Sequence, residues 1–563
     1  RLNAKMENID DIYPLSPMQR LMLMHSLRVP GSSTLSNLFR YRILGTLDRD
    51  RFESAWQQAI DSHPALRTAF VWEDIEEPLQ VVRSHARMLI EYVTLDECNT
   101  DDSAQTLAKL EQVERERGFD LASAPLLRMT VVCISDNEHV LLWSRHHLIL
   151  DLWSVELLFE EVFQVYDGAH VSRADDAGFR DYIAWLSNQD KAEAEDHFRK
   201  SLDGFSLPSL LFSERARRSE WSPQGQPVVE QRIDVRNVKN FARSNGLTFG
   251  SVVQAAVALL IAERLHRDDV AYGLTVAGRP SELLGVESIL GTFINDVPVR
   301  TKIDREQRVV DWIGVLQSEH AARQPFEYLS PIDVHRCSDV PPGRPLYDLL
   351  LLLQAPGAVA LPDHDSLKLE PLSGPFDSAL PMTLAVEQEG AEARLTAVYD
   401  GAVVATAMAE AILDGLASWL QRISGSGDAT LGEMLSHVEA TAIPRSVALA
   451  NPNSGNTDGI SATLIDIWQR TLGIEEIGLD DDFFALGATS IQAAIAFAEI
   501  ERWLGRDLPL SILFKASSIR ALLTVFEEPV EAPSSLVTIQ RQGVRPPVLA
   551  CSGIGGNVIG TVG

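Results

Sequence analysis

A stretch rich in Pro, Asn, Gly and Ser divides the chain into two unequal folding units. It covers 441–459 (TAIPRSVALANPNSGNTDG) and holds few large apolar residues, which is typical of a flexible linker. A second stretch of this kind covers 529–545. We therefore expect a large domain at 10–440 and a small one at 460–528, with the two stretches as linkers.

The large unit is too long for one hydrophobic core, so we expect two lobes, at about 10–175 and 176–440. Its pattern mixes strands and helices, which indicates an α/β (α+β) fold. Leu127–Ser135 is rich in β-branched residues, and a turn signal follows it. His139–His147 is then expected to form the return strand of a hairpin.

Helical spacing begins soon after this hairpin. Apolar side chains share one helical face, with Ser154 as the expected N-cap, at Val155, Leu158, Phe159, Val162 and Tyr166. A second helix is expected at Phe249–Arg264 and a strand at Asp269–Val276. The small unit shows helical spacing throughout, and we expect an all-α four-helix bundle that includes Ala462–Leu472, Ser490–Leu504 and Ser518–Phe526.

Composition argues against several classes of protein. The chain has 49 Lys and Arg against 79 Asp and Glu, a net charge of −30, which disfavours binding to nucleic acid or to anionic lipid. Its four cysteines are far apart, which argues against a disulfide framework or a cysteine-rich zinc site and fits a reducing cytoplasm. The longest apolar stretch, Val252–Ala262, is too short to span a bilayer. We expect no metal, nucleic-acid or membrane partner.

Two histidines and an aspartate stand where the predicted hairpin ends. They are His146, His147 and Asp151, and they lie just before the predicted helix. Histidine titrates near neutral pH, which suits a base that takes a proton from an attacking amine or hydroxyl. Asp151 could fix a histidine tautomer or the local loop. From these residues alone, two structural histidines and a helix-capping carboxylate explain the pattern equally well.

Six ordered motifs extend this pattern into a family resemblance. Over about Ile12–Glu439 the chain resembles the condensation domain of nonribosomal peptide synthetases. The matching stretches are Tyr13–Gln19, His63–Phe70, His146–Asp151, Phe179–Trp185, Gly291–Asn295 and Gln324–Glu327.

The resemblance implies a fold and a set of roles. It implies two lobes resembling chloramphenicol acetyltransferase, with a tunnel in which two carrier-borne thioesters meet at His147. His147 and His146 form the family's catalytic signature, and His147 deprotonates or orients the acceptor amine. Asp151 is expected to support the active site by pairing with Arg67, and Asn295 is expected to be a further support.

The chain departs from the family pattern near these motifs. Leu152 stands where glycine is usual, Asp296 where threonine is common, and Ala322-Arg323 where a Gln-Asp pair is common. We interpret these differences as variation between subtypes. The first histidine of the signature, His146, argues against the heterocyclising relatives, which have aspartate there.

The small unit carries a second motif, Asp480–Ile491 (DDDFFALGATSI). A lone Gly-x-x-Ser would make Ser490 no more than an N-cap. The whole stretch, however, resembles the attachment site of peptidyl carrier domains, although Ala488 replaces a usual glycine. The resemblance implies 4′-phosphopantetheine covalently attached to Ser490 and a phosphopantetheinyl transferase as partner.

The C-terminal stretch, 546–563, resembles the first strand and oxyanion loop of a thioesterase. We expect a truncated stub of an α/β-hydrolase-like domain, although Ser552 stands where histidine is usual. The chain contains no Gly-x-Ser-x-Gly nucleophile elbow, so it cannot hydrolyse a thioester by that mechanism. Because the chain starts at Arg1, we expect it to be a piece of a longer polypeptide.

The sequence therefore predicts an acyltransferase that forms an amide bond. The donor would come from an upstream carrier domain and the acceptor amine from the arm on Ser490. An adenylation enzyme acting in trans and a downstream thioesterase domain are the other expected partners. Ester formation with a hydroxyl acceptor, or a non-catalytic platform that recruits carriers or tailoring enzymes, are the alternatives.

Overall fold

The computed structural model describes most of the two predicted folding units. The described residues are 8–28, 35–73, 75, 77–95, 100–169, 178–212, 226–341, 344–354, 367–373, 380–436, 459–474, 476–486, 488, 490–504, 512 and 516–527. The predicted linkers at 441–459 (except Gly459) and 529–545 and the thioesterase-like stretch at 546–563 lie outside them.

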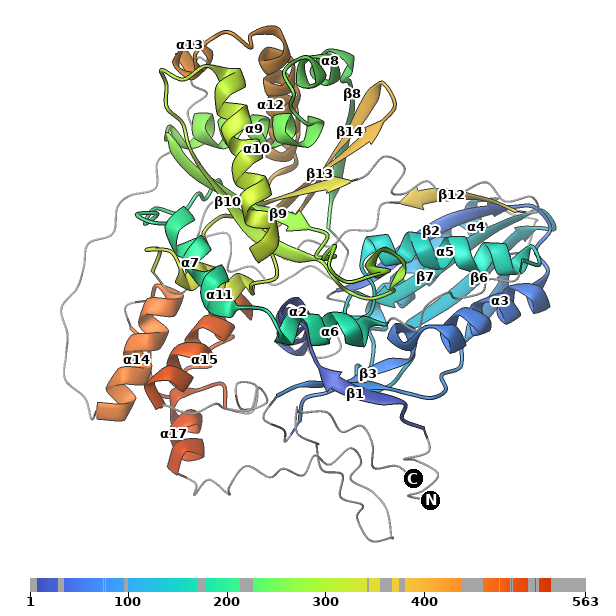
Figure 1. The fold of residues 1–563 in the computed structure, drawn as a ribbon. Helices are drawn as coiled ribbons and strands as arrows, with labels where there is room; N and C mark the ends of the chain where they lie inside the picture. The colour runs from blue at the N-terminus through green and yellow to red at the C-terminus, as the bar shows by residue number, and fades with distance from the viewer. Residues whose placement is uncertain are drawn as a thin grey trace.

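The N-terminal lobe is built on a five-stranded sheet of order β12-β2-β7-β6-β5 (Figure 1). Its strands are β2 (Ser36–Leu44), β5 (Ile90–Thr94), β6 (Leu127–Ser135), β7 (Glu138–His146) and β12 (Lys368–Ser373). A small sheet of order β1-β4-β3 lies beside it, formed by β1 (Asp11–Pro14), β3 (Thr68–Val71) and β4 (Leu79–Val82). The antiparallel pair β6–β7 is the hairpin that the sequence predicts.

The C-terminal lobe has a six-stranded sheet of order β10-β9-β11-β13-β14-β8. Its strands are β8 (Val228–Asp234), β9 (Asp269–Val276), β10 (Asn295–Lys302), β11 (Leu349–Gln354), β13 (Met382–Glu389) and β14 (Glu392–Tyr399). Strand β11 pairs in parallel with β9 and β13, and the other neighbours are antiparallel. The strand predicted at 269–276 is confirmed.

Helices cover both sheets. Those of the first 200 residues are α2 (Pro17–Arg28), α3 (Arg49–Ser62), α4 (Thr100–Glu116), α5 (Leu152–Tyr166), α6 (Phe179–Ser187) and α7 (Lys191–Ser201). Those of the C-terminal lobe are α8 (Arg236–Ser244), α9 (Phe249–Leu265), α10 (Val309–Arg323), α11 (Pro331–Arg336), α12 (Thr406–Gly425) and α13 (Leu431–Ser436). Single 3-10 turns lie at η1 (Pro64–Arg67), η3 (Val286–Ser288) and η4 (Gln324–Phe326).

Each lobe has its own hydrophobic core. Residues of α9 from Val252 to Ala262 are buried in the C-terminal lobe, which explains why this stretch is apolar except at Gln254. The N-terminal core buries the predicted face of α5, from Val155 to Tyr166. It also takes in Leu369 of β12, which comes from the range predicted for the second lobe. A strand from the second half of the chain thus completes the sheet of the first lobe.

The N-cap of α5 differs from the sequence prediction. The helix begins at Leu152, and Asp151 is its cap: its side chain accepts a hydrogen bond from the Ser154 backbone N–H. Ser154 therefore lies inside the first turn. Aspartate caps as well as serine does, and the apolar spacing that set the predicted start says nothing about the first turn.

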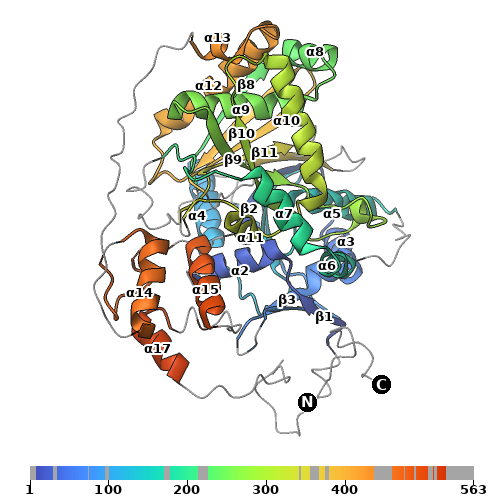
Figure 2. The same cartoon turned by 60° about the vertical axis from the view of Figure 1, so that its left-hand side comes forward.

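The described part of the carrier unit forms three helices, α14 (Gly459–Leu472), α15 (Ser490–Leu504) and α17 (Ile519–Glu527). They enclose a small core that includes Trp468 and Phe483, whose ring centroids are 4.6 Å apart. Helix α15 packs against α2 and α11 of the large unit (Figures 1 and 2). Met24 of α2 is buried within the carrier core, at 6% exposure.

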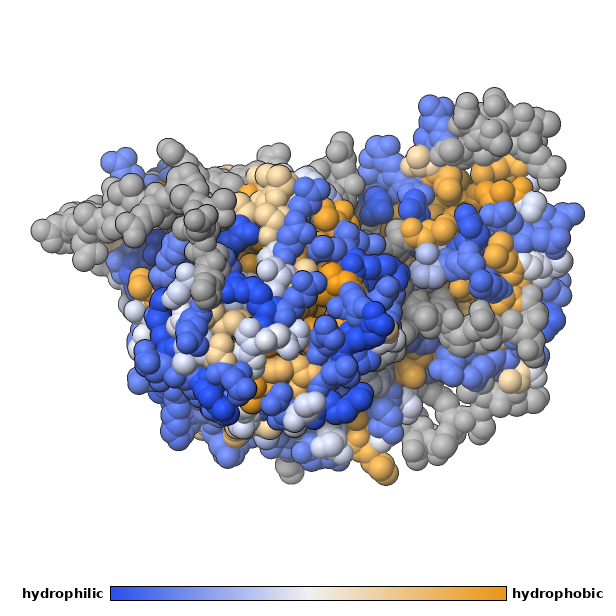
Figure 3. All heavy atoms as spheres, turned by 90° about the horizontal axis from the view of Figure 1, so that it is seen from above, coloured by the Kyte–Doolittle hydropathy of each residue, from blue (hydrophilic) through white to orange (hydrophobic). Residues whose placement is uncertain are grey.

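Within the described ranges, no single helix is long and apolar enough to cross a membrane. The bent pair α8 and α9 meets that criterion only when both helices are taken together, and α9 is a buried core helix. The face seen from above in Figure 3 intersperses hydrophilic and hydrophobic residues.

Candidate active site

The two histidines of the signature stand at the end of β7. His146 is the last strand residue, opposite Ser36 of β2, and its backbone N–H donates to the Leu126 carbonyl at 2.9 Å. The His147 N–H donates to the Leu35 carbonyl at 2.8 Å. The strands on both sides therefore hold the backbone on which the histidine rings stand.

The ring of His146 is fully engaged. Its Nδ1 accepts a hydrogen bond from the Leu148 N–H at 3.2 Å, which assigns the proton to Nε2. Nε2 then donates to Ser26 Oγ at 3.2 Å, and Ser26 Oγ donates to the Met22 carbonyl at 3.0 Å. Burial, with the neighbouring His147 and Arg145, lowers the pKa of His146 to about 3. His146 is therefore a neutral brace between α2 and the turn.

The ring of His147 is held differently. Among the described residues, no side chain hydrogen bonds to it, whereas Thr292 Oγ1 donates to its backbone carbonyl at 2.7 Å. Burial, and then the Arg145 guanidinium, lower the pKa of His147 to about 4. An imidazole with that pKa is neutral at pH 7 and can accept a proton.

Asp151 is 1% exposed and its oxygens face inward. Besides capping α5 at 2.8 Å, it accepts a hydrogen bond from the Phe293 N–H at 3.1 Å. Its third partner is Arg279, whose Nη2 lies 3.3 Å from Oδ1. Asp151 thus joins the N-terminal lobe to the segment between Gly291 and β10, a contact set that suits support rather than proton transfer.

The predicted pair of Asp151 with Arg67 is wrong. Arg67 Nη1 lies 2.6 Å from Asp10 Oδ2, and its Nε donates to the Ile60 carbonyl at 3.1 Å. Arg67 ends η1, directly before β3, so these contacts hold it beside the small sheet. Arg279 reaches Asp151 instead, from the segment after β9.

Arg279 is a supporting residue that the sequence reasoning missed. Its side chain is 5% exposed, and its Nη2 also donates to Ser154 Oγ at 2.9 Å. The guanidinium lies 4.1 Å from the Phe293 ring centroid. The sequence Gly278-Arg279-Pro280 directly after a predicted strand could have drawn attention to this arginine. It does not, however, predict contact with an aspartate 128 positions away.

A second set of contacts ties the Gly291–Asn295 motif to α5. Ser154 Oγ donates to the Gly291 carbonyl at 2.8 Å and accepts from its N–H at 3.0 Å. A Cβ at Gly291 would stand 2.1 Å from Phe179 Cδ2, so this approach requires glycine. Asn295 Nδ2 donates to the Glu327 and Leu329 carbonyls, at 2.7 and 2.8 Å, and so links β10 to the start of α11.

Three further polar residues hold the turn that carries the signature. Gln19 Nε2, at the start of α2, donates to the Leu148 carbonyl at 2.9 Å and to Gln80 Oε1 at 3.1 Å. Arg145 Nη1 donates to the Leu150 carbonyl at 2.6 Å. Gln19 ends one of the motifs visible in the sequence and Arg145 directly precedes another, whereas Gln80 carries no signal there.

Glu156 is an ionisable group near this site that the signature does not include. It lies on α5 and faces Glu387 of β13 and Asp151 closely enough for their charges to act on it. Burial, and then these two carboxylates, raise the pKa of Glu156 to about 8. An acid from each lobe thus lies where the lobes meet.

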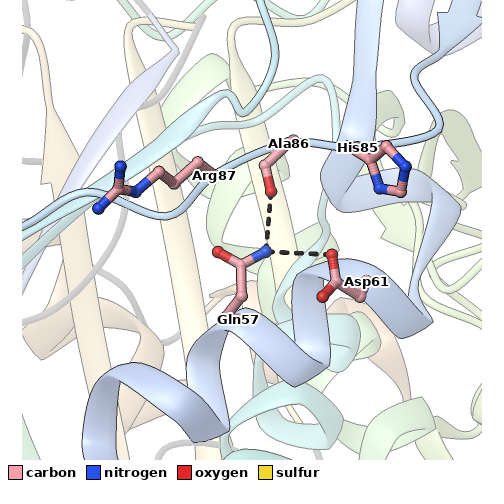
Figure 4. Close-up of a pocket in the computed structure, with 5 residues that line it drawn as sticks. All are labelled: Gln57, Asp61, His85, Ala86 and Arg87. Atoms are coloured by element: carbon pink, nitrogen blue, oxygen red, sulfur yellow. Dashed lines mark hydrogen bonds between the residues drawn. The ribbon is translucent and has the colours of Figure 1, made fainter. Parts of the chain in front are cut away.

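A surface depression of about 520 Å³ lies elsewhere, on α3 and the β4–β5 connection (Figure 4). Gln57 Nε2 bridges the Ala86 carbonyl, at 2.9 Å, and Asp61 Oδ1, at 3.0 Å. None of the signature residues lines it. In the described residues there is no group of three His, Cys, Asp or Glu side chains that could hold a metal ion.

Comparison with known families decides the assignment. A family model described as Condensation domain matches residues 9–344, and one described as Phosphopantetheine attachment site matches 462–526. The chain belongs to the condensation-domain family. It is a condensation domain of a nonribosomal peptide synthetase, an acyltransferase domain, followed by a carrier domain of the kind that bears 4′-phosphopantetheine on a serine.

The relatives that this chain matches are very long synthetases, and each match covers only a small part of the relative. The chain is 35% identical over 364 residues to one polypeptide of the linear gramicidin synthase of Brevibacillus parabrevis, covering 62% of this chain and 5% of the relative. It is 31% identical over 440 residues to another polypeptide of the same synthase, covering 76% and 9%. Against surfactin synthase subunit 2 of Bacillus subtilis, it is 29% identical over 337 residues, covering 59% and 9%. The chain thus spans less than a tenth of each of these relatives.

Solved structures share the fold. A holo four-domain nonribosomal peptide synthetase bound to AMP and glycine matches with a TM-score of 0.64 at 17% identity, covering 76% of this chain and 34% of that one. The X-domain from teicoplanin biosynthesis, in complex with OxyB, matches with a TM-score of 0.63 at 20% identity, covering 76% and 95%. The predicted condensation-domain fold is confirmed.

Proposed function

We propose that this chain forms an amide bond between a donor acyl or peptidyl thioester on an upstream carrier and an acceptor amine on the arm at Ser490. One observation carries the proposal: α15, which begins at Ser490, packs against α2, and α2 also contacts the ring of His146. The carrier thus sits on the element that borders the histidine turn. A carrier so placed is suited to act as acceptor for its own condensation domain.

The amine nitrogen attacks the donor thioester carbonyl, the new C–N bond forms, and the C–S bond breaks. The proton lost by the amine passes to the departing thiol of the donor arm. His147 is neutral because burial disfavours its protonated form, so it can accept or orient that proton. Holding two tethered reactants in one place supplies much of the rate.

The supporting residues keep His147 in position. Asp151, Arg279 and Ser154 fix the start of α5 against Gly291, and Thr292 fixes the His147 carbonyl. His146 acts as a positioning residue in this proposal, because both of its ring nitrogens are already bonded within the fold.

Ser490 would hold the phosphopantetheine. It opens α15, and backbone N–H groups at a helix start favour a phosphate. The group, when bound, supplies a long flexible thiol that carries the acceptor as a thioester. A phosphopantetheinyl transferase would install it, an adenylation enzyme acting in trans would load it, and a thioesterase beginning at 546–563 would act downstream. We propose a cytoplasmic location for this assembly.

Intact-protein mass spectrometry tests the proposal. The Ser490 arm is installed enzymatically with a candidate aminoacyl group, and a donor-loaded upstream carrier is then added. We expect a mass gain equal to the donor acyl group in wild type, loss of that gain in His147→Ala, and full retention in His85→Ala, an exposed histidine outside the site. No gain across a broad panel of donors and acceptors, with Ser490 demonstrably modified, would refute the proposal.

A further inference from the structure

Helix α2 lies between the carrier and the histidine turn and touches both. Met24 is 6% exposed and belongs to the hydrophobic core of the carrier. Ser26 lies on the side that faces His146, and its Oγ also donates to the Met22 carbonyl one helical turn earlier. Two positions along a helix correspond to a rotation of about 200°, so Met24 points away from that side. One helix thus contacts the carrier on one face and the active-site turn on the other.

Helix α2 is hydrogen bonded to the histidine turn at two points. At its start, Gln19 Nε2 donates to the Leu148 carbonyl at 2.9 Å. Near its end, Ser26 Oγ accepts from His146 Nε2 at 3.2 Å, and His146 Nδ1 in turn accepts from the Leu148 N–H at 3.2 Å. The Leu148 carbonyl is therefore bonded directly to Gln19 of α2, and the Leu148 N–H is connected to Ser26 of α2 through the His146 ring.

The start of α2 is fixed in place by several hydrogen bonds. Ser16 and Gln19 form a reciprocal cap: the Gln19 N–H donates to Ser16 Oγ at 3.2 Å, and the Ser16 N–H donates to Gln19 Oε1 at 3.0 Å. Gln80 donates to the same Gln19 oxygen at 2.9 Å. Movement of α2 would therefore be expressed mainly at its other end, where Met24 and Ser26 lie.

We propose that Ser26 is a positioning residue that couples the docking of the carrier on α2 to the orientation of the His146 ring, and thereby to the turn that presents His147. Docking would hold α2 in the position in which the Ser26 hydroxyl meets His146. Release of the carrier would loosen that hydrogen bond and the Leu148 N–H behind it. The inference rests on the proposed function, in which this carrier delivers the acceptor.

The coupling predicts a specific pattern of hydrogen exchange. The full-length holo protein is compared with Met24→Asp, Ser26→Ala and the double variant, by mass spectrometry of peptides covering 146–150. A neutral hydrogen bond contributes enough to change exchange roughly fivefold. We expect each single variant to speed exchange by about that factor, and the double variant to show no further increase, because both remove the same coupling.

Four controls keep the result interpretable. Exchange in α15 reports docking independently: it should rise strongly in Met24→Asp and, because coupling is reciprocal, by no more than about fivefold in Ser26→Ala. Ile332→Asp on α11, whose side chain also packs against the carrier core, releases the carrier without altering α2. Ser318→Ala on α10 removes an exposed serine with the same bond to the carbonyl four residues back, and should leave 146–150 unchanged. Ser26→Thr keeps the hydroxyl and should restore slow exchange.

Two outcomes would overturn the proposal. In one, the free-energy effects of the two substitutions add, so that the double variant exchanges about 25-fold faster than wild type, the product of two fivefold effects. In the other, Met24→Asp and Ile332→Asp release α15 while 146–150 exchanges as in wild type. A soluble aminoacyl thioester offered as acceptor in the intact-mass assay separates this result from the proposed function. Absence of any amide product in that assay would refute the proposed amide formation. The exchange pattern, in contrast, tests only the coupling between docking and the His146 ring.

Discussion

Replacing Arg279 by methionine would leave the carboxylate of Asp151 buried without its cation. The Arg279 side chain is 5% exposed and that of Asp151 1%, so solvent does not compensate the lost charge. Removing one partner of a buried ion pair costs about 3–5 kcal/mol. Because Asp151 keeps the backbone N–H groups of Ser154 and Phe293, we expect the lower end, about 3 kcal/mol of the free energy of unfolding.

Urea unfolding followed by tryptophan fluorescence measures this loss, since Trp56 and Trp143 lie in the N-terminal core. Asp151→Asn in the Arg279→Met background removes the uncompensated charge, so we expect the double variant to be more stable than the sum of the single losses predicts. Arg67→Met is the matched control, because Arg67 pairs with Asp10 instead.

We expect Arg67 and Asp151 to show additive losses within about 0.5 kcal/mol. The reasoning would be refuted if Arg279→Met matched wild type within that range, or if Arg67 coupled to Asp151 as strongly as Arg279 does.

Three further predictions follow from the same geometry. The folded-state pKa values of His146 and His147 lie below the ordinary value, so the unfolded chain takes up protons first as pH falls from about 6.5. The free energy of unfolding should therefore decline toward pH 4 and 3. In thermal melts, His146→Gln should make that decline less steep. The pKa of Glu156 is raised to about 8, so Glu156→Gln should stabilise the protein increasingly as pH rises from about 5 to 8, which melts at pH 5, 7 and 9 would show; a constant difference would contradict the raised pKa. Gly278 has φ +61° and a Cβ there would stand 1.8 Å from the Phe293 carbonyl oxygen, so Gly278→Ala should destabilise by at least about 2 kcal/mol, whereas Gly314→Ala, in open space on α10, should be neutral or stabilising in the same urea assay.

Local patterns predicted local structure well. The hairpin, the helix at 249–265, the strand at 269–276 and the helix beginning at Ser490 all follow from periodicity and turn residues within about 20 positions. The start of α5 was predicted less well, since apolar spacing marks the buried face of a helix and not its first turn. The histidine motif was visible for the same local reason: its three residues span only six positions.

Contacts between distant segments were not predictable in this way. Arg67 stands in one of the six motifs and Arg279 in none of them, and nothing in a single sequence says which of the two reaches Asp151. The choice depends on how the segment after β9 folds back across α5, through contacts with Ser154, Gly291 and Phe293.

The amino-acid sequence by itself determined the order of the domains, the local elements and the residues of the signature, because periodicity, turns and short motifs act over a few neighbouring residues. Tertiary structure alone decided that Arg279 pairs with Asp151, that β12 completes the sheet of the other lobe, and that α2 lies between the carrier and His146. Those pairings depend on shape and burial summed over segments more than a hundred residues apart, and only the packed fold brings such segments into contact.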